Sequence, residues 1–153
     1  MKISRIAANL LAAAALTGFL GGSLAHAHDD AYLDTQKAPN GGQLRMAGPF
    51  HYELVVVRDS REAKENPVYV YLTDHAGNKV SSAGASGSAI ILAGKQKATA
   101  TLKPDGDNRL RGMAIYSSDP EMKVVVAIIQ ADKKTEQARF TPLAAMPGMD
   151  HKH

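Results

Sequence analysis

Short apolar runs separated by turn residues fill the chain from about Gly42 onward. Within these runs hydrophobic and polar positions alternate, as in PVYVYLT at 67–73, where Val68, Val70 and Leu72 occupy every second position. Successive side chains of a strand point to opposite faces of a sheet, so a period of two predicts strands. No stretch keeps a helical period for long. The pattern predicts an all-β protein, an Ig-like antiparallel β-sandwich of about seven or eight strands over residues 42–143.

The connections between the expected strands are read from composition. The polar run 59–66 is expected to be a loop, and the small residues of 81–88 a close crossing or a flexible connection. The wholly apolar run VVVAII at 124–129 suits a central strand. The expected strands cover residues 50–58, 67–73, 89–93, 97–103, 109–117, 122–131 and 133–143.

The first 27 residues have the layout of a secretory signal peptide. Lys2 and Arg5 precede an apolar run rich in Ala and Leu, and small residues follow it. Cleavage is expected before His28 or, in a second frame, before His26. No other stretch is apolar and long enough to span a bilayer. We therefore expect one domain exported to the periplasm, with secretion as the alternative.

Composition narrows the class of function. Loss of Lys2 and Arg5 with the signal peptide lowers the net charge from +3 to +1, which argues against nucleic acid or a membrane surface as the partner. Cysteine is absent, so a site for a soft metal would use Met and His instead of thiolate. The chain carries no nucleophile elbow, P-loop or dinucleotide fingerprint. We expect a binding protein and not an enzyme.

His51 and Glu53 lie two positions apart at the start of the strand expected over 50–58. Residues two apart on a strand share a face, so the imidazole and the carboxylate project together. Such a pair can supply two ligands to a divalent ion. The alternative is a pair that faces water at the rim of the sandwich. His75, in the turn at 74–78, is expected to face solvent.

The two ends of the mature chain carry further candidate ligands, and both segments, 28–41 and 144–153, are expected to be flexible. Thioether favours Cu(I) and imidazole suits Cu(II), Ni(II) and Zn(II), so a tail with both can hold copper in either oxidation state. Cleavage before His28 would leave an N-terminal amine and an imidazole that chelate one ion together. The alternative is a pair of segments whose histidines are incidental. The predicted metal ligands are His28, His51, Glu53, Met146, Met149, His151 and His153.

Three segments of the chain resemble a known family. They read APNGGQLRMAGPFHYELVV at 38–56, VYVYLTDHAGNKVSSAGASG at 68–87 and LKPDGDNRLRG at 102–112. In this order they resemble small periplasmic proteins associated with heavy-metal and copper efflux systems. The β-sandwich domain of that family also occurs fused to periplasmic adaptor subunits of resistance-nodulation-division pumps. The resemblance covers residues 38–112 and implies a role in metal handling.

The family pattern begins Pro-His-Gly-Gly and continues through a His-x-Glu-Leu-Val strand to a turn with Asp-His and Gly. Position 40 departs from it, because Asn40 stands where the family has His. If that His is a ligand in the family, this chain lacks it. The resemblance does not name the ion. The matching residues are Pro39, Gly41, Gly42, His51, Glu53, Leu54, Val55, Asp74, His75 and Gly77.

Two functions follow from these observations. The first is a periplasmic copper carrier or buffer, with zinc or nickel as alternative ions, that passes its ion to the adaptor of a metal efflux pump or shields the cell from it. The second is an envelope β-sandwich that binds no metal and docks on a pump or adaptor subunit through an edge strand. Loss of metal binding on removal of the tail would distinguish the two.

Overall fold

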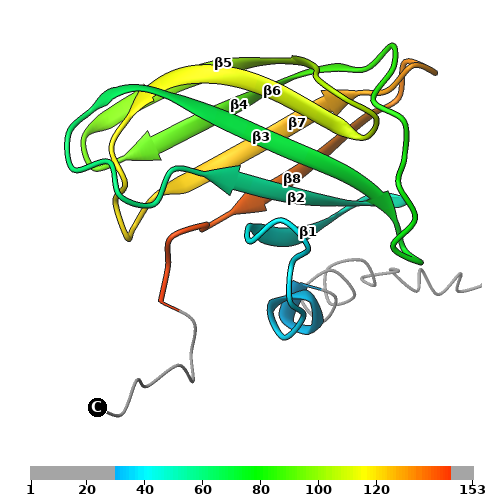
Figure 1. The fold of residues 1–153 in the computed structure, drawn as a ribbon, viewed down its shortest axis with the longest axis horizontal. Helices are drawn as coiled ribbons and strands as arrows, with labels where there is room; N and C mark the ends of the chain where they lie inside the picture. Colours follow the sequence, from blue (N-terminus) through cyan, green and yellow to red (C-terminus); the bar gives the residue numbers. More distant parts are fainter. Residues whose placement is uncertain (1–29, 146–153) are drawn as a thin grey trace, which may run out of the picture.

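The computed structural model describes residues 30–145, and within them the chain forms almost entirely antiparallel β-structure (Figure 1). The prediction of an all-β, antiparallel fold is confirmed, including its upper count of strands. The predicted signal peptide lies outside the described residues. The strands are β1 (Gln43–Ala47), β2 (Phe50–Val56), β3 (Lys64–Asp74), β4 (Ser86–Ala93), β5 (Gln96–Pro104), β6 (Arg109–Tyr116), β7 (Lys123–Ile129) and β8 (Thr135–Phe140).

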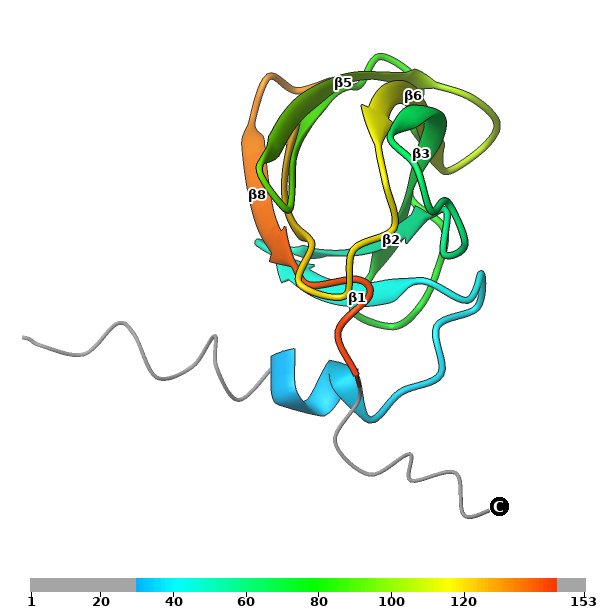
Figure 2. The ribbon, with the colours of Figure 1, turned by 90° about the vertical axis from the view of Figure 1, so that its left-hand side faces the viewer.

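The eight strands follow one another in the order β1-β2-β3-β6-β5-β4-β7-β8. β5 and β6 join through only two residue pairs, Lys103 with Arg111 and Pro104 with Leu110. This short junction divides the strands into two groups of four, which face each other across the core. Seen end-on in Figure 2, the strands run around a ring, and β1 lies next to β8.

β1 and β8 are joined at their ends by a side chain. The Gln43 carboxamide oxygen accepts a hydrogen bond of 2.8 Å from the Thr141 backbone amide, and its nitrogen lies 3.5 Å from the Thr141 hydroxyl. A side-chain amide can replace one step of a backbone ladder because it offers both a donor and an acceptor. The sheet is therefore nearly closed.

The core lies between the two groups of strands. On β2 the residues Tyr52, Leu54 and Val56 point inward, and the period of two predicted from the sequence is observed. The Tyr52 hydroxyl accepts a hydrogen bond of 3.3 Å from the Gln130 side chain, and burial raises the pKa of Tyr52 to about 12. The largest fully buried side chains are Tyr52, Tyr116, Phe140, Leu54, Leu72, Ile91, Leu102, Leu110, Met122, Ile128, Val68 and Val70.

Three strands differ most from the sequence-based expectation. One of them, β4, begins at Ser86, inside the connection expected over 81–88. β1 is not among the expected strands. Its polar residues Gln43 and Arg45 are buried, as is Ala47, because each polar side chain has a partner. β3 begins at Lys64, inside the expected loop. The buried Asn66 side chain donates to the Ser60 hydroxyl at 3.0 Å and to the Tyr116 carbonyl at 2.8 Å, so its polar group is satisfied within the strand.

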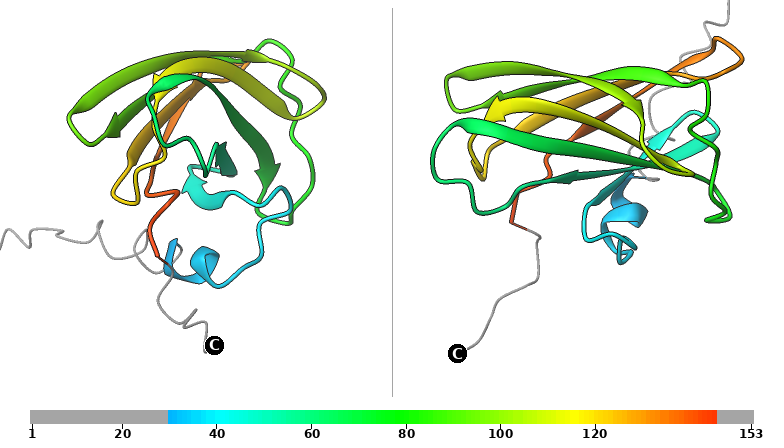
Figure 3. Two further views of the ribbon diagram at one scale, coloured as in Figure 1. Left: turned by 60° about the vertical axis from the view of Figure 1, so that its left-hand side comes forward. Right: turned by 45° about the horizontal axis from the view of Figure 1, so that its top comes forward.

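Residues 30–40 pack beside β1, outside the ring of strands (Figure 3). They begin with a helical turn at 30–34, whose Leu33 is only 4% exposed. The Arg45 guanidinium lies 2.6 Å from one carboxylate oxygen of Asp34 and 3.8 Å from Asp30. These ion pairs and the buried leucine hold residues 30–40 against the sheet, whereas the segment 28–41 was expected from the sequence to be flexible.

None of the helical structure within residues 30–145 has the length and hydrophobicity needed to cross a membrane.

Candidate functional site

A cleft of about 490 Å³ lies on the outer face of β2 and β3, closed on one side by residues 30–40. Its walls come from three parts of the chain that are distant in sequence. Side chains that can accept or donate hydrogen bonds or bind an ion are concentrated in it. They include Asn40, His51, Glu53, His75, Lys37 and Lys79.

The strand register explains why His51 and Glu53 share this cleft. On β2 the even-numbered positions from 52 point into the core, so positions 51 and 53 point outward. Their cross-strand partners on β3 are Thr73 and Tyr71, which line the same cleft. The prediction that His51 and Glu53 project together is confirmed.

Glu53 is buried, at 3% exposure, and its carboxylate has three hydrogen-bond donors. One oxygen accepts from the backbone amides of Asn40 and Gly42, at 2.8 and 3.0 Å. The other accepts from the Asn40 side chain at 2.9 Å. Hydrogen bonds to an ionised acceptor are about twice as strong as neutral ones, so Glu53 fixes the loop before β1. This loop forms one wall of the cleft.

Asn40 is therefore a structural partner of Glu53. It occupies the position where the resembled family has His, and it uses both its backbone and its side chain to bind the carboxylate. The sequence showed the departure at position 40 but not its consequence. Only the fold brings residue 40 to a carboxylate that lies 13 residues further along the chain.

His75 lies in a turn that its neighbours hold in shape. One Asp74 carboxylate oxygen accepts from the backbone amides of Ala76 and Asn78, at 2.9 and 2.8 Å, and the other accepts from the Asn78 side chain at 3.0 Å. Gly77 adopts a φ of 84°, which glycine reaches without strain. This is the Asx type of turn, in which a short polar side chain satisfies the backbone.

The same hydrogen bonds affect the acidity of Asp74. Its bond with the Asn78 side chain, followed by the backbone amides, lowers the pKa of Asp74 below its ordinary value. A carboxyl group whose pKa is lowered in the folded state stabilises the fold at pH values above its ordinary pKa. This stabilisation is lost as the pH falls through the pKa of the folded state. The turn that carries His75 therefore keeps these bonds at neutral pH.

The two imidazoles of the cleft stack on each other. The ring centroids of His51 and His75 are 4.9 Å apart, with an angle of 22° between the ring planes. Nε2 of His75 lies 3.2 Å from the backbone carbonyl oxygen of Gly48. His75 is exposed, as expected from the sequence, but it also contacts a predicted site residue. The contact of His75 with Gly48 joins the turn after β3 to the turn between β1 and β2.

The remaining predicted ligands are outside the part of the chain that the structure describes. Within residues 30–145, no three His, Asp or Glu side chains converge in an arrangement that could hold a metal ion. His51 and Glu53 stay predicted ligands. The residues outside the described range are His28, Met146, Met149, His151 and His153.

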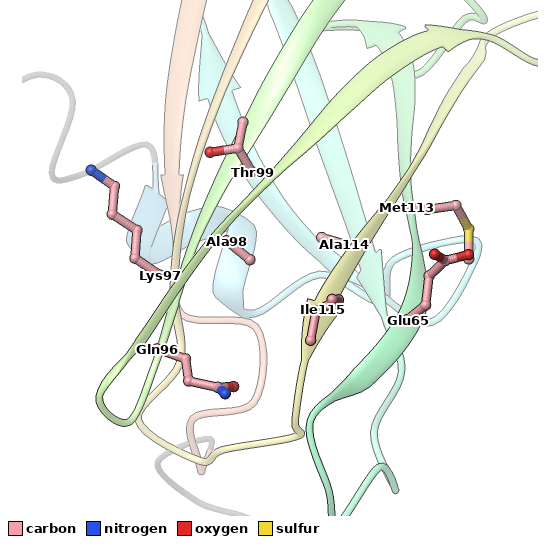
Figure 4. A pocket seen from close by; sticks show the side chains of 8 residues that line it. All are labelled: Glu65, Gln96, Lys97, Ala98, Thr99, Met113, Ala114 and Ile115. Carbon is pink, nitrogen blue, oxygen red and sulfur yellow. The ribbon is translucent and has the colours of Figure 1, made fainter.

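A second hollow, of about 500 Å³, lies where β5 and β6 diverge (Figure 4). Next to the paired residues the two strands are still close at Gly112, where an added Cβ would lie 2.6 Å from the Thr101 carbonyl oxygen. Beyond it the strands separate, and Met113 and Ile115 of β6 are 38% and 58% exposed. We call this hollow the β5–β6 seam. Its lining residues are Glu65, Gln96, Lys97, Ala98, Thr99, Met113, Ala114 and Ile115.

No family model matches the chain, and it has no significant match among the curated proteins or the solved structures. The resemblance to efflux-associated periplasmic proteins stays a prediction.

Proposed function

We propose that the protein is a periplasmic metal-binding protein, a copper carrier or buffer in heavy-metal resistance or efflux, with zinc and nickel as alternative ions. One observation carries the proposal. The imidazoles of His51 and His75 lie 4.9 Å apart at a cleft that also holds the Glu53 carboxylate. Imidazole is a ligand that suits copper, zinc and nickel.

The open form of the cleft supports a carrier more than a structural metal site. A structural zinc site is closed by four protein ligands, whereas an open site keeps positions that exchange with solvent or with another ligand. Within residues 30–145 the cleft offers two imidazoles and a carboxylate that already has three donors. A carrier that delivers its ion to the adaptor of an efflux pump needs such exchangeable positions.

Calorimetric titration of the exported chain tests the proposal. The protein, free of any tag, is titrated with Cu(II), Cu(I), Zn(II) and Ni(II), beside a variant that ends after Ala145. Stoichiometric binding with a Kd below about 10 μM, equivalent to roughly 7 kcal/mol, is expected for copper. Absence of such binding for every ion would overturn the proposal. Loss of binding on truncation would place the main site in the tail.

The β5–β6 seam favours a second candidate, a sandwich that docks on a pump or adaptor subunit. Met113 and Ile115 are exposed at the seam, and β5 and β6 pair through only two residue pairs. A strand from a partner could add to such an edge. In that case a double variant M113S/I115S would lose partner binding in a pull-down with the adaptor, and the wild-type protein would bind no metal.

A further inference from the structure

We propose that His51 and His75 form a Cu(II) site with two imidazole ligands and open remaining positions, in which Nδ1 of His75 is the donor atom and Glu53 is a positioning residue. The inference rests on the proposed function, since it names the ion and the ligand atoms of the same site. It adds His75, to which the sequence assigned no role beyond facing solvent.

The separation of the two rings fits coordination to one ion. A divalent ion held by imidazole lies about 2 Å from the ring nitrogen, which puts the centroids of two neighbouring ligands roughly 5 Å apart. The observed distance between the centroids of His51 and His75 is 4.9 Å. The rings are stacked, with 22° between their planes, and an ion lies in the plane of each imidazole that binds it. Coordination of one ion therefore requires one ring to turn about its side-chain torsions, with little change in the distance between the two side chains.

The contact with Gly48 selects the nitrogen of His75 that can bind. A carbonyl oxygen only accepts hydrogen bonds, so Nε2 of His75 carries the proton in the 3.2 Å contact with the Gly48 carbonyl. In the neutral ring Nδ1 then holds the lone pair. Histidines that bind metals almost always donate their other N–H group to a carboxylate, carbonyl or water, which fixes the tautomer and the orientation of the ring.

Both histidines are held by hydrogen-bonded supports. Asp74 holds the turn of His75 through three hydrogen bonds. His51 lies on β2, which pairs with β1 and β3 on its two sides. Glu53, two residues further on, has both carboxylate oxygens bonded to Asn40 and Gly42. Glu53 therefore acts by fixing the loop that forms one wall of the cleft, and not by binding the ion itself.

The ligand set favours Cu(II) over the other ions. Affinity of a nitrogen site for divalent ions rises to Cu(II) and falls again at Zn(II). Cu(I) prefers thioether sulfur, and among residues 30–145 those that line the cleft include no methionine. Lys37 and Lys79 also line the cleft and oppose the charge of an ion there. The two imidazoles must bind a divalent ion against this charge, and the remaining coordination positions stay exchangeable.

The experiment compares two double variants of the exported chain, H51A/H75A and H151A/H153A, which each remove two imidazoles. Both are titrated with Cu(II), and electron paramagnetic resonance counts the nitrogens bound to the ion. We expect H51A/H75A to weaken Cu(II) binding at least about 100-fold, more than the loss of an outer-shell partner costs. The nitrogen couplings should disappear with it, while H151A/H153A retains them.

The outcomes separate the inference from the proposed function. Cu(II) binding that survives in H51A/H75A and is lost in H151A/H153A would overturn the inference and leave the carrier in place. A wild-type protein that binds no metal would overturn both. A thermal melt of H51A/H75A close to that of the wild type excludes unfolding as the cause, and His75 is exposed, so the fold should tolerate its loss.

The role of Glu53 has its own readout. In E53Q the carboxylate becomes an amide of nearly the same shape. If Glu53 is a positioning residue, this substitution weakens Cu(II) binding about tenfold and leaves the number of coordinated nitrogens unchanged. A change in the equatorial oxygen ligands seen by pulsed resonance, without a change in the stability of the apoprotein, would instead identify Glu53 as a ligand.

Discussion

The cleft on β2 and β3 and the β5–β6 seam are hollows of nearly equal size, about 490 and 500 Å³, yet they differ in chemistry. The cleft contains two imidazoles and a buried carboxylate fixed by hydrogen bonds. The seam is an opening between diverging strands, with exposed Met113 and Ile115 on one wall. Volume does not distinguish a binding site from a gap in a sheet. The distinction comes from side chains that converge and are held in place.

The sharpest test of this comparison substitutes side chains of the cleft and of the seam in separate variants. H75A should weaken Cu(II) binding at least about 100-fold, because a ligand is lost, while M113S/I115S should change it less than twofold. Isothermal titration measures both on the same protein preparation. Equal effects from the two variants would contradict the assignment of the ion to the cleft.

The seam is expected to matter for folding rather than for binding. In G112V the new side chain meets the Thr101 carbonyl oxygen at the point where β5 and β6 approach. Overpacking of this kind costs about 3 kcal/mol of unfolding free energy. Urea denaturation followed by circular dichroism gives the value. A loss below about 1 kcal/mol would show that the junction of the two groups of strands adapts easily.

Glu53 links the stability of the cleft to its binding. E53Q is expected to lower the free energy of unfolding by about 2 kcal/mol, because hydrogen bonds to a charged acceptor are replaced by weaker ones. In addition, the new side-chain NH2 group of the glutamine faces an N–H donor in place of an acceptor. Urea denaturation of E53Q and of N40A tests this, since N40A removes only the side-chain donor and should cost less. An equal loss in the two variants would argue against the backbone donors as the main partners.

Alkaline pH tests the core that supports both hollows. The pKa of Tyr52 is raised to about 12 by burial, so the unfolded state ionises first as the pH rises above its ordinary value. Stability is therefore fully present below about pH 10 and falls by on the order of 2 kcal/mol as the pH approaches 12. Tyrosinate absorbance and urea denaturation across this range provide the check. In Y52F the loss should be smaller.

The smallest expected effect concerns charge in the cleft. K79A removes a positive charge near the proposed ion and should tighten Cu(II) binding about twofold at low salt, since exposed charges interact weakly and are screened. The same substitution at Lys97, in the seam, is the matched control and should have no effect. Titrations at two ionic strengths measure both variants. A gain at Lys97 equal to that at Lys79 would indicate a general charge effect.

Much of the fold could be predicted from the alternation of apolar and polar residues. The run at 67–73 and the strand that carries His51 and Glu53 were both found in this way, including their outward-facing positions. β1 was missed because two of its three buried positions, Gln43 and Arg45, are polar. Their partners Thr141 and Asp34 lie elsewhere in the chain, so local periodicity carries no trace of them.

The candidate site was predicted only in part, for a related reason. The sequence placed His51 beside Glu53 because a strand has a fixed period of two. It could not pair His51 with His75, since that contact depends on the turn after β3 reaching the turn between β1 and β2. Nor could it pair Asn40 with Glu53, which meet through a loop folded back on β2.

The sequence by itself determined the all-β class, the strands with alternating faces and the side of β2 on which the candidate ligands project. These properties follow from backbone geometry and hydrophobic burial over a few neighbouring residues. Only the tertiary structure decided that the carboxylate of Glu53 would hold a loop and that two imidazoles would stack across a cleft. Hydrogen bonds and ring contacts form between groups close in space, and the path of the chain, not its local pattern, brings those groups together.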